Sequence, residues 1–239
     1  MSLHFHPLTV KEVKRETPDC VSVIFDVPAS LQNEFAFSQG QSLTLRTRIN
    51  GQDIRRNYSI CSSPLEKKLR VAIKKVEGGL FSTFANEQLK KGDVLEVMPP
   101  VGKFNTPLHP DQQKNYMAIA AGSGITPVIS LIKTTLATEK HSRFTLVFGN
   151  RNRNSIIFFE ELEALKNQYM DRFRLVHILS RERMDTEINF GRITAEKLQE
   201  LDRGRTDIDA DQRRLRFRPQ SHWYLPFPRA LTRTWCSST

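Results

Sequence analysis

No long hydrophobic run occurs in the 239 residues of this chain. A helix that crosses a membrane needs about 20 predominantly apolar residues. The N-terminal residues 1–14 also lack the apolar core of a signal peptide. The sequence therefore predicts a cytoplasmic protein with no membrane-spanning segment.

Cysteine is scarce, with three widely spaced residues at Cys20, Cys61 and Cys236. Zinc sites use closely spaced cysteine or histidine pairs, and iron–sulfur clusters use a close-set group of four cysteines. Neither pattern is present, so we expect no metal site in this chain. The odd number also argues against a framework of disulfides and favours a reducing compartment.

Acidic residues are outnumbered 26 to 36 by Lys and Arg, which gives a net charge of +10. About half of this excess lies in residues 203–239, which contain eight arginines, no lysine and three aspartates. Such a tail could bind nucleic acid by displacing counterions from the phosphates. Because the rest of the chain is only mildly basic, we expect no nucleic-acid partner, and binding by the tail remains an alternative.

Short segments that alternate between apolar and polar residues fill the chain from residue 8 to about 105. Turn-forming pairs such as Asn50-Gly51 and Gly78-Gly79 separate them. This spacing predicts an antiparallel Greek-key β-barrel over residues 1–108, with one helix inserted at Ser82–Gln88. The expected strands are Leu8–Val13, Cys20–Phe25, Ser42–Arg48, Arg56–Ile60, Leu69–Val76 and Val94–Met98.

Strands and helices alternate after residue 109, which predicts a parallel α/β layer over residues 109–202. With three strands, this layer would be incomplete. Residues 203–239 match neither pattern and are expected not to belong to the fold, as a shift of reading frame in the gene would explain. The expected strands are Tyr116–Ala120, Arg143–Phe148 and Arg174–Leu179, and the expected helices are Ile125–Leu136, Ile156–Tyr169 and Ala195–Leu201.

The first candidate site is Arg56-Asn57-Tyr58-Ser59, on an expected barrel strand. Alternation places Arg56 and Tyr58 on one face of that strand and Ser59 on the other. An aromatic side chain can stack on a flat ring, and a guanidinium two positions away can pair with a pyrophosphate. An ordinary strand with an exposed charge is the alternative.

A second candidate site lies where Gly78 and Gly79 precede a helix that has Ser82 in its first turn. Glycines let the backbone approach phosphate oxygens, and the N-terminus of a helix points N–H groups at an anion. A hairpin turn followed by a serine cap is the plainer alternative.

The third candidate site is the turn Gly122-Ser123-Gly124-Ile125-Thr126-Pro127, directly after an apolar strand and at the start of a helix. Such a turn can seat a nucleotide phosphate on the helix N-terminus, although it is not the GxGxxG pattern. A tight connection without a ligand is the alternative.

Polar residues also follow the other two strands of the parallel layer, Arg151 after one and Ser180-Arg181 after the next. Open α/β sheets bind ligands at this edge, so these side chains could hold phosphates. A serine next to an arginine also suits a 2′-phosphate. Surface arginines at strand ends are equally common without a ligand.

Taken in order, the motifs RxYS at 56–59, GGxxS at 78–82 and GSGITP at 122–127 resemble those of the ferredoxin–NADP reductase superfamily. The sequences GNR at 149–151 and SRE at 180–182 extend the resemblance, which covers about residues 5–201. Within the superfamily, the chain is most similar to the reductases that serve di-iron oxygenases in phenylacetate degradation.

This resemblance implies that the chain binds FAD and NADPH or NADH, with Ser180 and Arg181 favouring NADPH. It also implies hydride transfer to the flavin and electron transfer to an iron–sulfur domain and di-iron oxygenase subunits. Tyr58 and Ser59 are the implied catalytic residues, because they would lie at the flavin. The implied binding residues are Arg56, Tyr58, Ser59, Gly78, Gly79 and Ser82 for FAD, and Gly122, Gly124, Thr126, Arg151, Ser180 and Arg181 for the nicotinamide cofactor.

Two features of these reductases are missing from the sequence, a strand that ends in Cys-Gly-Pro-x-x-Met and a ferredoxin domain with four cluster cysteines. We therefore expect no iron–sulfur centre in this chain and inefficient hydride transfer. A catalytically impaired remnant that binds FAD but cannot position the nicotinamide is the alternative to a working reductase.

Overall fold

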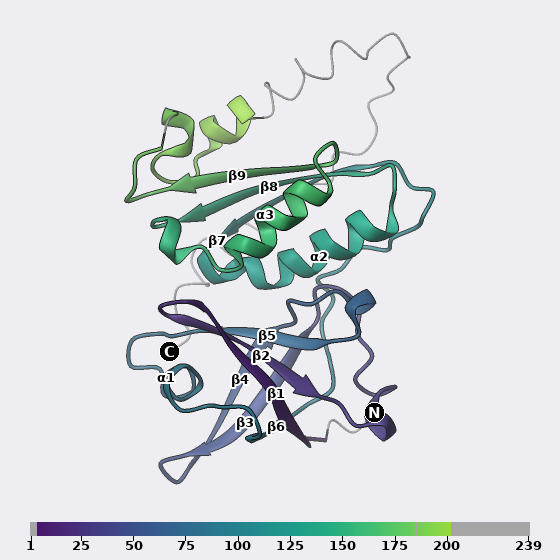
Figure 1. Ribbon diagram of the computed structural model, residues 1–239, viewed down its shortest axis with the longest axis vertical. Helices are drawn as coiled ribbons and strands as arrows, with labels where there is room; N and C mark the ends of the chain where they lie inside the picture. Colours follow the sequence, from purple (N-terminus) through teal and green to yellow (C-terminus); the bar gives the residue numbers. More distant parts are fainter. Residues whose placement is uncertain (1–3, 185, 202–239) are drawn as a thin grey trace.

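The computed structural model describes residues 4–184 and 186–201 of the chain. They form an antiparallel β-barrel and a parallel α/β layer, stacked one on the other (Figure 1). Within the described residues, none of the helices is long and apolar enough to cross a lipid bilayer. The fold class predicted from the sequence is confirmed.

Six strands and one α-helix make up the barrel in the described residues. These are β1 (His6–Thr17), β2 (Cys20–Asp26), β3 (Ser42–Ile49), β4 (Gln52–Ser59), β5 (Leu69–Lys74), α1 (Leu80–Glu87) and β6 (Val94–Val97). The parallel layer contains β7 (Asn115–Ala121), α2 (Ile125–Thr138), β8 (Arg143–Asn150), α3 (Phe159–Gln168), β9 (Phe173–Leu179) and the helical residues 195–201. Short 3-10 helices occur at Ala29–Leu31, Pro64–Glu66, Gly122–Gly124, Arg153–Ser155 and Glu187–Asn189.

The barrel closes where β4 meets β5, the two strands at the ends of the sheet order. Its strands are hydrogen-bonded in the order β4-β3-β6-β1-β2-β5, and each pair is antiparallel. Ile60, directly after β4, bridges Val71 on β5, and the amide of Cys61 donates to the carbonyl of Arg70 at 2.9 Å. This contact removes the free edges that an open sheet would leave.

Strand β4 begins at Gln52, four residues before the start predicted from the sequence. Asn50 and Gly51 have φ angles of 51° and 79°, which give the tight turn typical of a two-residue hairpin. Gln52 to Arg55 therefore pair with β3 even though they are mostly exposed. The sequence pattern detected only the partly buried end of this strand.

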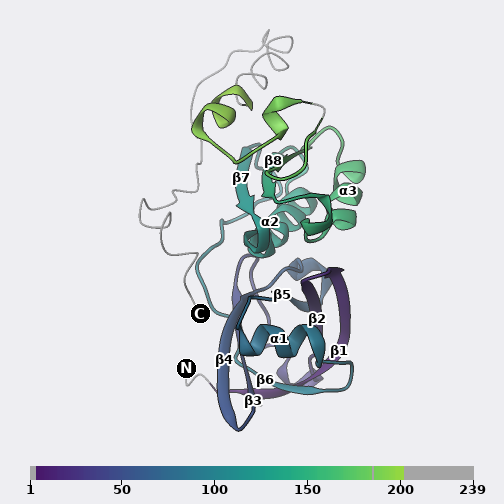
Figure 2. The same ribbon diagram turned by 90° about the vertical axis from the view of Figure 1, so that its left-hand side faces the viewer.

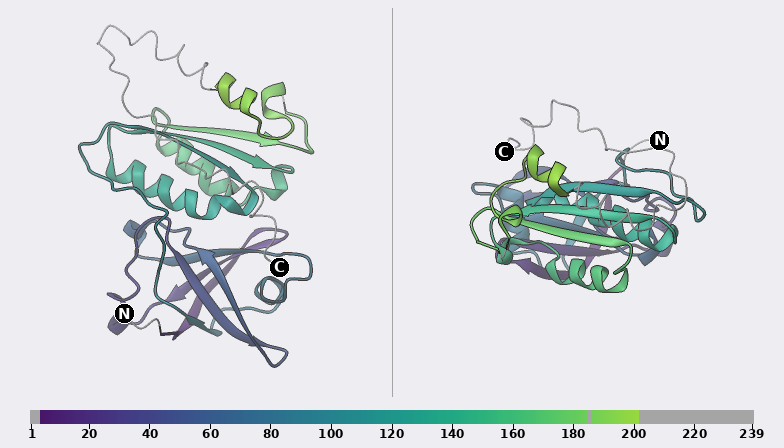
Figure 3. Two further views of the ribbon diagram at one scale, coloured as in Figure 1. Left: turned by 180° about the vertical axis from the view of Figure 1, so that it is seen from behind. Right: turned by 90° about the horizontal axis from the view of Figure 1, so that it is seen from above.

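The parallel sheet has the order β7-β8-β9 in the described residues, so the carboxyl ends of its strands lie at one edge. Helices α2 and α3 cover the face toward the barrel (Figure 1). The helical residues 195–201 cover part of the other face, where Leu201 packs with Val147 and Ile178 (Figure 3).

Helix α3 begins at Phe159, so the predicted start at Ile156 is wrong. Phe158 has a φ of 63°, a left-handed conformation that a right-handed helix cannot contain. Ile156, Ile157 and Phe158 are all buried, and their apolar run was mistaken for the first turn of a helix.

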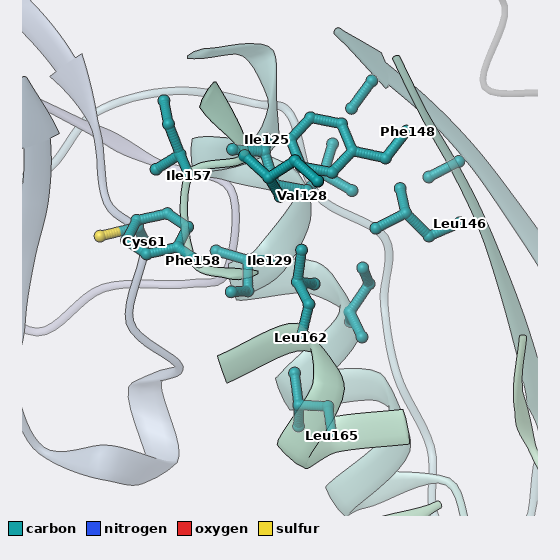
Figure 4. Packing of buried hydrophobic residues seen from close by; sticks show 14 of the residues in the cluster. Cys61, Ile125, Val128, Ile129, Leu146, Phe148, Ile157, Phe158, Leu162 and Leu165 are labelled. Atoms are coloured by element: carbon teal, nitrogen blue, oxygen red, sulfur yellow. The ribbon is translucent and has the colours of Figure 1, made fainter. Parts of the chain in front are cut away.

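The barrel has its own buried core around Leu43, Leu45 and Phe81, and a second buried cluster joins the parallel layer to the barrel. Cys20, Cys61 and Ala72 of the barrel belong to the same buried cluster as the apolar residues of α2 and α3. Figure 4 shows Phe158 of the parallel layer and Cys61 of the barrel among the residues of this cluster. A hydrogen bond also joins the two parts, in which the Ser130 hydroxyl of α2 donates to the carbonyl of Ser62 in the barrel at 2.7 Å.

An ionic network crosses the same interface. Arg70 donates to Glu16 of the barrel at 2.7 Å and to Glu161 of α3 at 2.9 Å. Lys133 of α2 pairs with Glu161 and, at 3.0 Å, with Glu66 of the barrel. The two cations are mostly buried, since the side chains of Arg70 and Lys133 are 12% and 8% accessible, whereas Glu66 is 38% accessible.

Acid should weaken this interface. Burial alone would raise the pKa of Glu161, but the charges of Lys133 and Arg70 outweigh burial and lower it. A carboxyl whose pKa is lowered by folding stabilises the fold above its usual pKa, and this contribution disappears as the pH falls through the lower value. We expect the thermal midpoint of the unmodified protein to fall more steeply below about pH 5 than that of Glu161→Gln, measured by circular dichroism. Equal slopes of the thermal midpoint against pH in the two proteins would contradict this expectation.

Candidate functional site

Tyr58 occupies a fixed position near the end of β4. Its ring centroid lies 5.6 Å from that of Phe81 in α1, at an interplanar angle of 37°. Phe81 is 1% exposed, whereas Tyr58 is partly exposed. Burial raises the pKa of the Tyr58 phenol, so it stays protonated. The strand thus presents an aromatic ring supported from one side, followed by the half-buried Ser59.

Arg56 is exposed on the same strand, two residues before Tyr58. One guanidinium nitrogen donates to the carbonyl of Arg55 at 2.8 Å. Among the described residues, no carboxylate forms a salt bridge with Arg56, in contrast to Arg55, which pairs with Asp53 at 3.2 Å. The remaining N–H groups of Arg56 are therefore available to an anion.

The turn before α1 is built on Gly78 and Gly79. Gly78 has a φ of 71°, and Gly79 precedes the first residue of the helix without a side-chain cap. The Ser82 hydroxyl accepts from the amide of Val76 at 3.1 Å and donates to the carbonyl of Gly79 at 3.2 Å. Ser82 braces the turn, and the uncapped N–H groups of the first helical turn suit a phosphate.

Gly79→Ala should loosen this turn. A methyl group at Gly79 would lie 2.5 Å from the Ser82 oxygen, which must then leave its hydrogen bond to Val76. The loss of a hydrogen bond is worth about 1 kcal/mol, so we expect the thermal midpoint to fall by about 2–4 °C in calorimetry. Gly124→Ala is the control, because its added carbon meets nothing within 4 Å. Equal shifts in the two variants would count against this role of Ser82.

Arg15 and Asn86 anchor α1, and the sequence analysis missed both. The buried Asn86 amide donates to the carbonyl of Ile73 at 3.0 Å and to that of Ser82 at 2.8 Å. Arg15 donates to the Asn86 side chain at 3.0 Å and to its carbonyl at 2.7 Å. Arg15 and Asn86 are 71 positions apart, so no local pattern could reveal the pair.

The turn after β7 leads directly into α2. Gly122 has a φ of 50°, and a side-chain carbon added at Gly122 or Gly124 would meet nothing within 4 Å. The Thr126 hydroxyl donates to the carbonyl of Ser123 at 3.0 Å, which closes the turn. The backbone of both glycines is thus open to a ligand at the N-terminus of a 14-residue helix.

Arg151, Ser180 and Arg181 lie together at the same edge of the sheet. The amide of Arg181 donates to the carbonyl of Arg151 at 2.8 Å, and that of Ser180 donates to the carbonyl of Asn150 at 2.9 Å. Both arginine side chains are exposed. Within the described residues, the side-chain nitrogen of buried Asn150 has no hydrogen-bond partner, a donor that a bound ligand can satisfy and that the sequence analysis did not single out.

The carboxyl ends of β7, β8 and β9 lie on the same side of the molecule as α1 (Figures 1 and 2). The turn before α1 and the carboxyl edge of the parallel sheet are therefore on one side of the molecule, below and above the interface, and the Tyr58 ring lies next to α1. In the barrel the Tyr58 ring lies beside Phe81 of α1, and at the sheet edge the backbone of Arg181 is bonded to that of Arg151.

Two family models match the chain in this same order. The model for the oxidoreductase FAD-binding domain matches residues 7–106, and the model for the oxidoreductase NAD-binding domain matches residues 118–213. The first match contains the strand of Tyr58 and the turn before α1. The second contains the glycine turn and the arginines of the sheet edge.

Curated relatives include one of the subunits of 1,2-phenylacetyl-CoA epoxidase from Escherichia coli (strain K12), which is 47% identical over 197 residues. That alignment covers 82% of this chain and 55% of the relative. The ferredoxin reductase component of 3-ketosteroid-9-alpha-monooxygenase from Rhodococcus rhodochrous is 41% identical over 72% of this chain and 48% of its own length. The chain thus spans about half the length of these relatives.

A solved structure of a ferredoxin NADP+ reductase from Neisseria gonorrhoeae, with bound FAD and NADP, has the same fold. Its TM-score is 0.66 at 21% identity, over 89% of this chain and 81% of that one. The resemblance that the motifs suggested is confirmed by these matches. The chain belongs to the ferredoxin–NADP reductase superfamily of FAD- and NAD-binding reductases.

Proposed function

We propose that this chain is the flavin- and nicotinamide-binding module of an oxygenase reductase. It takes a hydride from NADPH or NADH onto FAD and passes single electrons to an iron–sulfur domain that serves di-iron oxygenase subunits, as in phenylacetate degradation. The observation that carries this proposal is the position of the two candidate sites, one in the barrel and one at the edge of the parallel sheet, on the same side of the molecule (Figure 2).

For FAD, the proposed residues are those of β4 and of the turn before α1. Tyr58 stacks against the flavin ring, and Ser59 offers a hydroxyl to it. Arg56 pairs with the pyrophosphate, which the backbone of Gly78 and Gly79 and the turn braced by Ser82 also approach. Bound FAD accepts two electrons together and releases them one at a time, while the protein aligns the donor and excludes water.

For the nicotinamide cofactor, the proposed residues lie at the edge of the parallel sheet. Gly122 and Gly124 let the backbone approach a phosphate, and Thr126 holds their turn in place. The exposed side chains of Arg151 and Arg181 and the partly buried Ser180 form a second anion position, which favours NADPH over NADH because NADPH carries a 2′-phosphate.

The proposal includes the wider organisation of the protein. Residues 1–108 form the FAD-binding part and residues 109–202 the nicotinamide-binding part, while residues 203–239 lie outside the described residues. We propose that the iron–sulfur domain lies outside these 239 residues, because their three widely spaced cysteines do not form a close-set group of four. A cytoplasmic location agrees with the free thiols of Cys20 and Cys61.

The test is a visible absorption spectrum of the purified protein, followed by anaerobic additions of NADPH and of NADH. We expect flavin bands that bleach with NADPH at lower concentrations than with NADH. Absence of flavin bands after reconstitution with FAD would overturn the roles of Arg56, Tyr58 and Ser59. Bleaching by NADH at lower concentrations than by NADPH would overturn the roles of Ser180 and Arg181 in the choice of donor.

A second candidate function is an FAD-binding remnant that cannot position the nicotinamide. The three-stranded parallel sheet of the described residues favours it, because this sheet is small for a nucleotide-binding layer. Flavin bands that persist with both nucleotides would select this candidate. Nucleic-acid binding by the tail depends on residues outside those described, and it predicts affinity that disappears at moderate salt.

A further inference from the structure

Phe158 adopts a conformation that its side chain disfavours. Its φ of 63° is left-handed, and it is one of three residues other than glycine with a positive φ among the described residues. Asn50 and Lys67, the other two, are polar residues in exposed turns, whereas Phe158 is 2% exposed. Such strain persists only where the surrounding structure imposes it.

Arg70 of the barrel holds this strained residue in place. The guanidinium carbon of Arg70 lies 4.8 Å from the centroid of the Phe158 ring. Its nitrogens are fixed in turn by Glu16 and Glu161 at 2.7 and 2.9 Å. Phe158 and Cys61 also belong to the same buried cluster, in which Figure 4 labels both. A residue of the parallel layer is therefore clamped by the barrel.

This contact joins the two candidate sites through short stretches of chain. Cys61 follows Ser59 by two residues, and its amide and thiol both contact the carbonyl of Arg70, at 2.9 and 3.3 Å. Phe158 follows Arg151 by seven residues, through a 3-10 turn capped by Asn152. We call β4, which carries Tyr58, the flavin strand, and the carboxyl edge of the parallel sheet, which carries Arg151, the nucleotide edge. Each is thus connected to one end of the Arg70–Phe158 contact.

We propose that Arg70 and Phe158 are positioning residues, which set the separation between the flavin strand and the nucleotide edge and so align the nicotinamide with the flavin. The inference rests on the proposed function. Hydride transfer requires close approach of the reacting atoms, and a misplacement of about 1 Å can cost about 100-fold in rate. A clamp between the two layers therefore acts on the rate of transfer rather than on the binding of either cofactor.

The experiment compares Arg70→Met, which keeps the aliphatic stem, with Arg46→Met as the control. Arg46 also makes a bidentate pair, with Glu96 at 2.6 and 2.7 Å, but that pair lies within the barrel. FAD occupancy, the dissociation constant of NADPH and the limiting rate of flavin bleaching are measured anaerobically by stopped flow. Arg70→Met should lower the limiting rate about 10- to 100-fold, with occupancy and NADPH affinity within about twofold, and Arg46→Met should change none of the three.

A second readout needs no turnover. Hydrogen exchange without nucleotide should become faster in Arg70→Met in two segments at once, residues 58–62 and residues 151–158, and should stay unchanged in Arg46→Met. Phe158→Leu and Glu161→Gln serve as further variants if Arg70→Met does not fold. Arg70→Lys, which keeps the charge but offers a single donor group, should recover part of the rate.

The outcomes separate this inference from the proposed function. An unchanged limiting rate, or a rate that falls only together with NADPH affinity, overturns the positioning role. A lowered thermal midpoint with unchanged rate and exchange shows a purely structural contact and also overturns it. If the unmodified protein binds FAD but is not reduced by NADPH, the proposed function fails, and the exchange comparison alone decides whether the clamp couples the two segments.

Discussion

Tyr58→Ala should weaken the binding of FAD by about 10- to 100-fold, because stacking of a flat base on an aromatic ring is worth about 1–3 kcal/mol. Tyr58 is the partly exposed ring on the flavin strand, supported from behind by Phe81 at 5.6 Å. Titration of the FAD-free protein with FAD, followed by the quenching of flavin fluorescence, gives the dissociation constant.

Two variants control this result. Tyr58→Phe keeps the ring and should bind FAD within about twofold of the unmodified protein, since stacking does not need the hydroxyl. Tyr169→Ala removes a half-buried tyrosine of the parallel layer, whose ring lies 5.0 Å from the Arg172 guanidinium, and should leave FAD affinity unchanged. If Tyr58→Ala binds FAD as tightly as Tyr169→Ala, the proposed flavin site is wrong.

Phe148→Ala should lower the free energy of unfolding by about 3–5 kcal/mol, the usual cost of emptying a buried phenylalanine site. Phe148 is 0% exposed on β8, two residues before Asn150 at the candidate nucleotide edge. Because the cluster that contains Phe148 extends into the barrel through Cys20, Cys61 and Ala72, and an ionic network crosses the same interface, we expect the loss to appear in the whole protein rather than as a separate early transition. Urea unfolding followed by fluorescence and by circular dichroism measures both points.

The control for this prediction is Phe104→Ala, at a phenylalanine that is 40% exposed. Its loss of stability should be less than half that of Phe148→Ala, because little apolar surface returns to water. Two well-separated transitions in Phe148→Ala would show instead that the barrel stays folded without the parallel layer.

The sequence was sufficient for the fold because apolar periodicity is a local signal. The alternation around Leu43 and Leu45 marks a barrel strand, and both residues are fully buried. The apolar run of β7 followed by glycines marks a strand that leads into a helix. Closure of the barrel through Ile60 and Val71 had no such signal, since it depends on pairing between separate strands.

The candidate site was predicted as a set of residues, but not in its internal bonding. Ser82 was expected to bind FAD and Thr126 the nicotinamide cofactor, and in the structure both hydroxyls bond to the backbone of their own turns. Their roles toward a cofactor stay predictions. The network of Arg70, Lys133 and Glu161 was missed, because its members come from elements far apart in the chain and each alone looks like an ordinary surface charge.

Two cysteines in the buried cluster between the barrel and the parallel layer offer a way to measure how often these two parts separate. Cys20 and Cys61 lie in that cluster, and burial raises the pKa of each thiol to about 12. At neutral pH the reactive thiolate is then about 100,000-fold rarer than the thiol, and reagents have no direct access to it. Once Cys236 is replaced by serine, the rate of alkylation of the folded protein should report how often the barrel and the parallel layer part.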